Sequence, residues 1–255
     1  MKFIQDMRRK TRSKKRWLFG LLTFSCCIYY CGTSFTTGFH VYKEYAGEMD
    51  LQRSNKYSPP PQYSKDIRKK KERAKISKTG AWIISEQYEY LLDYDLANRL
   101  VTFFRNSSVI EFGAGTGRYT SYLKNEGINI RGYDGVENIS ELSKGLVQSL
   151  DLTKPVELEP SEWVLCLEVA EHIPRRYEKI FVENIQKTSK VGVVLSWAGL
   201  SQPGVGHVNN REQGYVKKVM SRGGLQYVEK SSNLLRESSK LWWFKKNIMV
   251  FIRQN

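Results

Sequence analysis

Two carboxylates and an imidazole stand within one short stretch, Glu168-Val169-Ala170-Glu171-His172, at the end of an apolar run. No basic residue lies between them to balance the two negative charges. Unpaired like charges held close together are costly, and they raise each other's pKa. A divalent cation would relieve this repulsion, with oxygen ligands favouring Mg²⁺ or Mn²⁺ and histidine ligands also allowing Zn²⁺. Without a metal, His172, or His207 from a later part of the chain, would serve as a general base for a hydroxyl group.

A second group of residues suits a ligand that lies close to the backbone. An apolar, β-branched run ends in Glu111 and Phe112, and glycines follow at alternate positions, Gly113, Gly115 and Gly117. Glycines in a turn between a strand and a helix permit positive φ angles and let a ligand approach the backbone. The free N–H groups at the following helix N-terminus attract a carboxylate or a phosphate. The spacing Gly-x-Gly-x-Gly differs from the Gly-x-Gly-x-x-Gly of dinucleotide-binding folds.

Short β-rich runs alternate with helical patterns along most of the chain. Strands are expected at 109–112, 128–134, 163–168, 191–196, near 226–228 and at 247–252, and helices at 85–105, from 118, and at 136–150, 173–188 and 211–222. This alternation predicts an α/β fold with a largely parallel sheet that helices cover on both faces. Ligands of such folds bind at the carboxyl ends of the strands, and Asp134 and Glu168 stand at such ends.

The motif Glu111-x-Gly113-x-Gly115-x-Gly117 after a first strand resembles motif I of class I S-adenosylmethionine (SAM) methyltransferases. The resemblance extends over roughly residues 82–255, within a predicted methyltransferase domain of residues 81–255, and implies a Rossmann-like, mostly parallel sheet of seven strands. In this family the acid of motif I orients the ammonium group in the methionine part of SAM, a role that falls to Glu111.

Two further acids stand where such a methyltransferase holds the nucleoside of SAM. Asp134 closes the second strand about twenty residues after the glycine turn, where a carboxylate accepts hydrogen bonds from both ribose hydroxyls. Asp151 and Leu152 stand where this family holds the adenine: the carboxylate accepts from the exocyclic amine, and the neighbouring N–H meets a ring nitrogen. The resemblance therefore implies SAM as the cofactor.

The motif Glu168-x-x-Glu171-His172 resembles the fourth-strand motif of ubiquinone-pathway O-methyltransferases and of small-RNA 3′-terminal 2′-O-methyltransferases. In those families the motif binds Mg²⁺ together with a histidine from a later loop. The resemblance makes Glu168, Glu171, His172 and His207 the candidate metal ligands, and Glu171, His172 and His207 the catalytic candidates. The alternative is that no metal binds: Glu168 then contacts SAM, His172 caps the next helix, and His172 or His207 is the general base.

The basic residues are concentrated before the predicted catalytic domain. Residues 1–80 hold 19 Lys and Arg against 6 Asp and Glu, whereas residues 81–255 hold 22 against 20. A dedicated nucleic-acid enzyme would more often be basic near its cleft, so this distribution argues against DNA or long RNA as a substrate.

The N-terminal part reads as a membrane anchor and a stem. Residues 1–16 form a basic tail, expected to be cytoplasmic, and residues 17–39 are uncharged and long enough to span a bilayer. Residues 40–80, rich in Pro and Lys, would form a stem. We expect a single-pass type II protein of the endoplasmic reticulum or Golgi with residues 81–255 in the lumen; a cleaved signal peptide or an interfacial anchor are the alternatives.

The acceptor is a hydroxyl compound in each enzymatic interpretation. A metal that bridges two adjacent hydroxyls favours a vicinal diol on a glycan or a small metabolite. The tail around Trp242 and Trp243 resembles the C-terminal signature of small methyltransferases associated with glycan modification; these indoles either stack on a sugar or are buried in the last helix. The alternatives are an RNA 3′-terminal 2′-O-methyltransferase and a SAM-binding scaffold without turnover. The sequence does not predict an oligomeric state.

Overall fold

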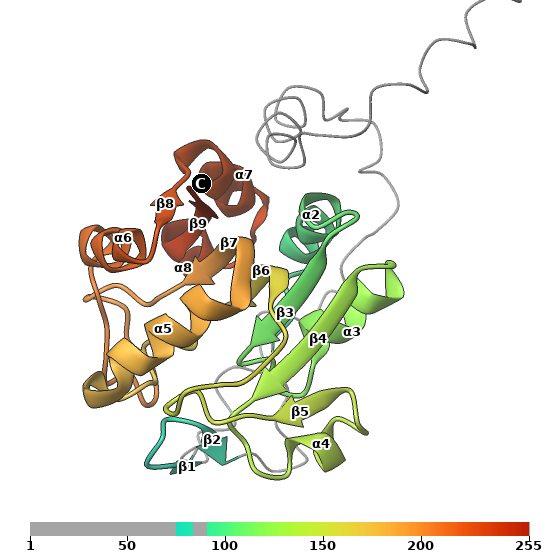
Figure 1. Ribbon diagram of the computed structural model, residues 1–255, viewed down its shortest axis with the longest axis vertical. Coiled ribbons are helices and arrows are strands. Elements are labelled where there is room, and N and C mark those ends of the chain that lie inside the picture. Colours follow the sequence, from blue (N-terminus) through green and yellow to red (C-terminus); the bar gives the residue numbers. More distant parts are fainter. Residues whose placement is uncertain (1–74, 84–90, 255) are drawn as a thin grey trace, which may run out of the picture. The chain divides into compact units, whose positions relative to one another are not determined.

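The computed structural model describes residues 75–83 and 91–254, which are drawn in colour in Figure 1. The predicted cytoplasmic tail, the anchor at 17–39 and most of the stem lie outside the described residues. Within the two described ranges, every helix is too short or too polar to cross a membrane.

The main sheet has seven strands in the order β5-β4-β3-β6-β7-β9-β8 (Figure 1). Their bounds are β3 Ser108–Phe112, β4 Asn129–Asp134, β5 Val147–Ser149, β6 Ser161–Cys166, β7 Ser189–Ser196, β8 Leu225–Tyr227 and β9 Ile248–Arg253. Neighbouring strands from β5 to β7 pair in parallel, and β9 runs antiparallel to β7 and to β8. The predicted Rossmann-like, mostly parallel seven-stranded sheet is confirmed.

The central strands are apolar on both faces because helices cover both. Trp163, Val164, Leu165 and Cys166 of β6 are all fully buried, although successive side chains of a strand point to opposite faces. Continuous apolar runs of this kind are typical of parallel strands between two helical layers.

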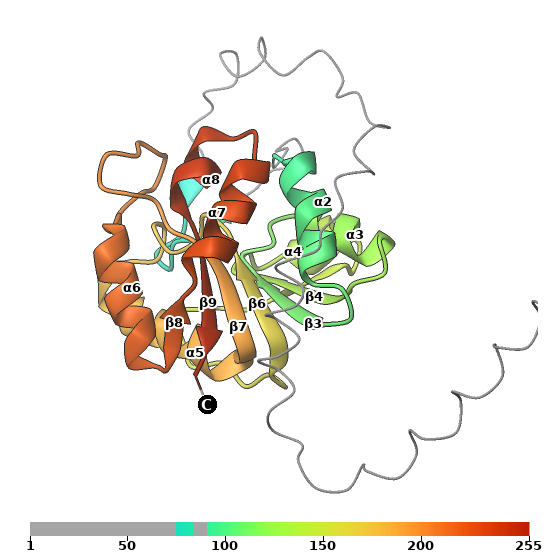
Figure 2. The same cartoon turned by 90° about the horizontal axis from the view of Figure 1, so that it is seen from above.

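The helices form two groups of mutual contacts, which Figures 1 and 2 show on different sides of the sheet. The first group is α2 Tyr94–Phe103, α3 Arg118–Asn125, α7 Glu229–Ser238 and α8 Trp242–Asn247. The second is α5 Glu178–Thr188 and α6 Gln213–Arg222; a short helix α4, Ile139–Leu142, lies beside β5, and a 3₁₀ turn, Arg175–Tyr177, precedes α5.

The helix predicted at 136–150 is wrong. The structure has only one helical turn there, α4, and the third strand, β5, begins at Val147. Lys144 and Gly145 have φ values of +54° and +80°, which end the helix and reverse the chain. The apolar spacing misled the prediction because Ile139 and Val147 pack into the same cluster from two different elements.

A two-stranded hairpin spans the predicted boundary between stem and catalytic domain at residue 80. Strand β1, Lys75–Ile76, pairs antiparallel with β2, Trp82–Ile83. Its turn is stabilised by Ser77, whose Oγ accepts hydrogen bonds from the N–H groups of Thr79 (3.3 Å) and Ala81 (3.1 Å). The last residues of the predicted stem therefore belong structurally with the catalytic domain.

Candidate active site

A cavity of about 630 Å³ lies at the carboxyl ends of β3, β4, β5 and β6. It is lined by the glycine turn, the acidic strand ends, the hairpin turn, the loop before His207 and the start of α8. The predicted site residues that line it are Glu111, Gly113, Asp134, Asp151, Leu152, Glu168, His172 and His207. Gly115, Gly117 and Glu171 do not line it directly.

The glycine turn has the conformation that its sequence predicts. Gly113, Gly115 and Gly117 have φ values of +72°, +55° and +85°, a region in which other residues are strained. A Cβ atom on Gly113 would also stand 2.1 Å from Cγ2 of Val169. The backbone at this turn is therefore bare because neither the dihedral angles nor the packing leaves room for a side chain.

Asp134 is oriented by the same turn. Its Oδ2 accepts a hydrogen bond from the N–H of Gly115 (2.8 Å), and its Oδ1 accepts one from the N–H of Val136 (3.1 Å). Burial raises the pKa of the Asp134 carboxyl, and these hydrogen bonds partly oppose that effect. These bonds hold the carboxyl group at the end of β4, and Asp134 is among the residues that line the cavity.

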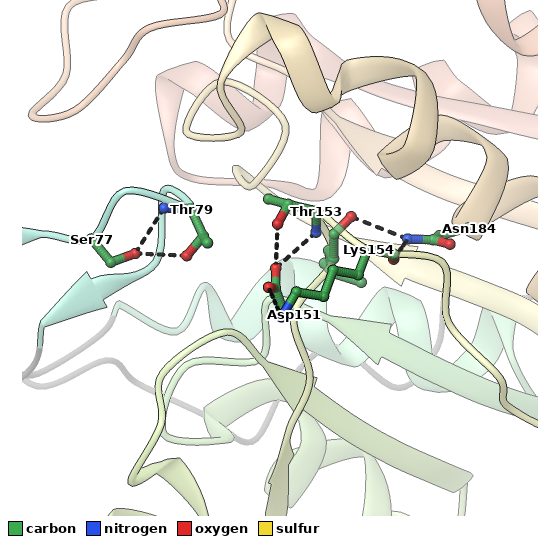
Figure 3. Close-up of polar contacts among 7 residues, drawn as sticks. Ser77, Thr79, Asp151, Thr153, Lys154 and Asn184 are labelled. Atoms are coloured by element: carbon green, nitrogen blue, oxygen red, sulfur yellow. Dashed lines mark hydrogen bonds and ion pairs between the residues drawn. The ribbon is translucent and has the colours of Figure 1, made fainter.

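The loop that carries Asp151 is fixed by contacts of the Asp151 side chain and by hydrogen bonds from Asn184 to the loop backbone (Figure 3). Its Oδ1 accepts hydrogen bonds from the N–H (2.9 Å) and the hydroxyl (2.6 Å) of Thr153, and Oδ2 stands 3.3 Å from Nζ of Lys154. Burial opposes ionisation of Asp151, but these donors prevail and the pKa is lowered. Asn184 of α5 donates to the backbone oxygens of Leu152 (3.1 Å) and Lys154 (2.7 Å), a support that the sequence did not reveal.

Glu111 is buried beneath the glycine turn. It accepts a hydrogen bond of 2.5 Å from Oγ1 of Thr120, and burial raises its pKa to about 8. Because Glu111 is among the residues that line the cavity, an ammonium group bound beside it would meet a buried acid that it can ionise.

Glu168 has an unusual backbone conformation for a residue with a side chain. Its φ is +55°, and its N–H donates to Oγ of Ser196 (2.8 Å). Its Oε2 accepts a hydrogen bond of 2.6 Å from Nε2 of Gln202, whose Oε1 accepts one from Asn247. Strain of this kind persists only where the surroundings enforce it, and it is found most often at functional sites.

The two histidines are held in matching ways. Nδ1 of His172 lies 3.3 Å from the carbonyl oxygen of Gly206, and Nδ1 of His207 lies 3.3 Å from that of Gln202. When Nδ1–H donates to a carbonyl, the Nε2 lone pair is left for a proton or a metal. Burial lowers the pKa of both rings, that of His172 to about 4 with the neighbouring His207 as a second cause. Both imidazoles are therefore neutral near pH 7.

Glu171 completes a group of three possible ligands. One ligand atom each of Glu171, His172 and His207 lies within 4.8 Å of the others. Glu171 is fully buried, its two carboxyl oxygens lack a hydrogen-bond partner within the described residues, and burial with the nearby charge of Glu168 raises its pKa well above the ordinary value. A divalent cation fits this orphaned acid and the two imidazole lone pairs. Of the four predicted ligands, Glu168 stands outside this group. Its Oε2 accepts from Gln202, and its Oε1 is buried without a hydrogen-bond partner among the described residues.

The loop that carries His207 requires its two glycines. A Cβ on Gly204 would stand 2.0 Å from Nε2 of His207, and one on Gly206 would stand 1.8 Å from Cδ1 of Ile76 in the hairpin. The pattern Gly204-x-Gly206-His207 was visible in the sequence, but the partner of Gly206 was not.

The last tryptophans lie at the cavity. Trp242 and Trp243 both line it, and Trp242 is 47% exposed, so burial in the last helix is wrong for this residue.

No protein-family model matches the chain, and no curated protein matches it. Its fold is similar to that of magnesium protoporphyrin IX methyltransferase from Synechocystis PCC 6803 with bound SAH, at 13% identity over 66% of this chain and 91% of that one, with a TM-score of 0.49. An amino pentose methyltransferase from Micromonospora echinaspora matches at 13% identity over 63% and 89%, with a TM-score of 0.49. A glycopeptide N-methyltransferase with bound SAM matches at 11% identity over 67% and 90%, with a TM-score of 0.48. The likeness to these structures concerns the fold alone.

Proposed function

We propose that this protein is a SAM-dependent methyltransferase that methylates a hydroxyl group of a vicinal diol on a glycan or a small metabolite. One observation carries the proposal: a single cavity combines a bare glycine turn and two oriented acids with a pair of neutral imidazoles. The glycine turn and the two acids suit the binding of an adenosyl cosubstrate, and the neutral imidazoles suit the acceptance of a hydroxyl proton.

The cosubstrate would lie along the ends of β3, β4 and β5. Asp134 would accept the ribose hydroxyls with the lone pairs that Gly115 and Val136 leave free. Asp151, ionised and fixed by Thr153, would accept the exocyclic amine of adenine. Leu152 would add the neighbouring N–H, Glu111 would meet the methionine ammonium, and Glu168 would line the floor.

The acceptor oxygen would attack the methyl carbon of the sulfonium in line. A C–O bond forms as the C–S bond breaks, and the electron pair remains on sulfur. Without a metal, the hydroxyl proton passes to Nε2 of His172 or His207; with a cation bound to these nitrogens, it passes to water. The protein contributes mainly by holding the two reactants in position.

Glu171, His172 and His207 would hold a divalent cation, which when bound would lower the pKa of an adjacent acceptor hydroxyl. Two imidazole nitrogens and one carboxylate suit Mn²⁺ or Zn²⁺ better than Mg²⁺, which prefers oxygen ligands.

The RNA alternative is less well supported. Among the described residues that line the cavity, Arg118 is the one lysine or arginine, whereas four are acidic. An RNA end would bring phosphates toward these acids. A scaffold without turnover would not account for Glu171, whose buried carboxyl oxygens lack a hydrogen-bond partner among the described residues.

We further propose that the domain is anchored as a type II membrane protein in the endoplasmic reticulum or Golgi. Residues 17–39 would span the membrane, and the eight Lys and Arg of residues 1–16 favour a cytoplasmic N-terminus.

The test is isothermal titration of the detergent-purified full chain with SAM and with its demethylated product SAH. Asp134→Asn should weaken binding by about tenfold or more, since each lost hydrogen bond to a polar ligand costs on the order of 1–2 kcal/mol. Glu183→Gln, on the exposed face of α5, is the matched control and should bind normally. A wild-type protein that binds neither nucleoside would refute the proposal.

A further inference from the structure

The hairpin turn covers the cavity and contacts both of its ends. Gly80 has a φ of +94°, and a Cβ there would stand 2.1 Å from the backbone oxygen of His172. At the other end Ala81 packs over Gly135, the residue after Asp134, where an added Cβ would meet that of Ala81 at 3.0 Å. The turn is therefore fixed against the histidine end and against the proposed ribose end.

Trp82 follows this turn and stands beside the histidine pair. Its ring meets the ring of His172 edge to face with centroids 5.5 Å apart, and His172 in turn lies 5.0 Å from His207. Trp82 also lines the cavity, so an indole borders the place where the acceptor hydroxyl must lose its proton.

Two more indoles enter the cavity from α8, and a buried acid fixes the turn before them. Oδ2 of Asp93 accepts hydrogen bonds from the hydroxyl of Ser239 (2.6 Å) and from the N–H groups of Lys240 (2.7 Å) and Leu241 (3.1 Å). The same side chain caps α2. Trp242 and Trp243 follow at once, so their positions depend on a fixed turn.

The remaining wall is largely apolar, and a positive charge lies close to it at Trp242, where Nζ of Lys246 lies 5.3 Å from the ring centroid. Leu91 and Val205 line the cavity although they are 45% and 57% exposed. Among the described residues that line the cavity, Glu168 is the charged residue near His172. The one basic residue of this lining, Arg118, lies at the start of α3 next to the glycine turn. When no cation is bound at Glu171, His172 and His207, an anionic acceptor would thus be placed beside Glu168 without a basic partner from this part of the wall, which costs binding energy.

We infer that Trp82, Trp242 and Trp243 form the acceptor subsite, and that this subsite takes an uncharged vicinal diol on a ring with an apolar face. The flat faces of indoles bind such rings by excluding water from both. A sugar and a catechol share this chemistry. The inference rests on the proposed methyltransferase function and specifies its substrate class.

The test uses three matched pairs, each titrated in EDTA into the full chain saturated with SAH, so that no cation attracts the anionic members. The pairs are uridine and uridine 5′-monophosphate, glucose and glucose 6-phosphate, and catechol and 3,4-dihydroxybenzoate. In the pair of the correct ring type, the neutral member should bind about tenfold or more tightly than the anionic one. The pair with the tightest neutral member distinguishes a sugar from a catechol.

Variants then test the indoles. Trp82→Ala and Trp242→Ala should each weaken the best neutral probe by about tenfold while the affinity for SAH changes by less than about twofold. Trp82→Phe should restore most of the binding. Leu200→Ala is the control, because Leu200 is 62% exposed and apolar but does not line the cavity.

The outcomes separate the two proposals. A wild-type chain that does not bind SAH refutes the methyltransferase function itself. A chain that binds SAH but binds the anionic members equally or better, or binds no neutral probe, overturns only the acceptor subsite.

Discussion

The binding of SAM should release close to one proton from Glu111. This carboxyl is buried and has a pKa of about 8, so about nine tenths of the molecules hold its proton at pH 7. The proposed partner is the methionine ammonium, and a cation within a few ångströms favours the ionised acid. If the pKa falls back toward its ordinary value in the complex, about 0.9 proton leaves for each SAM bound at pH 7.

The raised pKa of Glu111 determines whether SAM affinity rises or falls with pH. Below pH 8 the free protein holds a proton that the complex has lost, so raising the pH favours binding. The affinity should rise nearly tenfold between pH 6 and pH 7, about fivefold more between pH 7 and pH 8, and little above that.

Titration calorimetry measures this release directly. At pH 7 the observed enthalpy should differ between phosphate and Tris by about 0.9 of the difference in their ionisation enthalpies. Glu111→Gln should abolish this difference and flatten the pH dependence. The same buffer dependence in wild type and Glu111→Gln, or none in wild type, would refute the role of Glu111 as the acid that meets the ammonium.

Three shorter predictions concern other residues. Glu171→Gln should weaken Mn²⁺ binding about tenfold or more, and Glu168→Gln should weaken it much less, because of these two acids only Glu171 belongs to the three-ligand group. Electron paramagnetic resonance of free Mn²⁺ measures both affinities, and equal losses would contradict the grouping. Asp93→Asn should lower the free energy of unfolding by about 1–3 kcal/mol in urea titrations, since an amide NH₂ cannot accept the bonds from residues 239–241; an unchanged midpoint would contradict this. Asn106 is exposed in the sequon Asn106-Ser107-Ser108 and should carry a glycan if the domain is lumenal. Endoglycosidase should then increase the gel mobility of the wild-type protein but not of Asn106→Gln, and an unchanged mobility of both would count against a lumenal domain.

Local patterns predicted the parts of the fold that local physics determines. The strand from Trp163 to Cys166 is continuous and apolar because two helical layers cover it, and such a run is visible without any knowledge of its neighbours. The segment 136–150 failed because a single helical turn and a short strand packing into one cluster give the same apolar spacing as one longer helix.

In the candidate site, too, residues that lie close together in the sequence could be predicted, whereas residues that act over long sequence distances could not. The glycine turn and Glu168-x-x-Glu171-His172 are short motifs whose residues lie together in the chain, so their joint location could be predicted. Gln202, Asn184 and Asp93 position loops through hydrogen bonds to residues far away in sequence. Nothing in the composition around such residues distinguishes them from ordinary surface amides and acids.

The hairpin belongs with the α/β domain that follows it. A fragment that starts at residue 81 lacks Ile76, which packs on Gly206, and Gly80, which packs on the backbone of His172. It would expose the loop of His207 and leave Trp82 and Ile83 without the strand that pairs with them. We therefore expect residues 60–255 to bind SAH as the full chain does and residues 81–255 to bind it several-fold more weakly, as measured by titration calorimetry. Equal affinities would mean that the hairpin only rests on the domain, whereas a loss confined to the shorter fragment would make the end of the stem part of the active site.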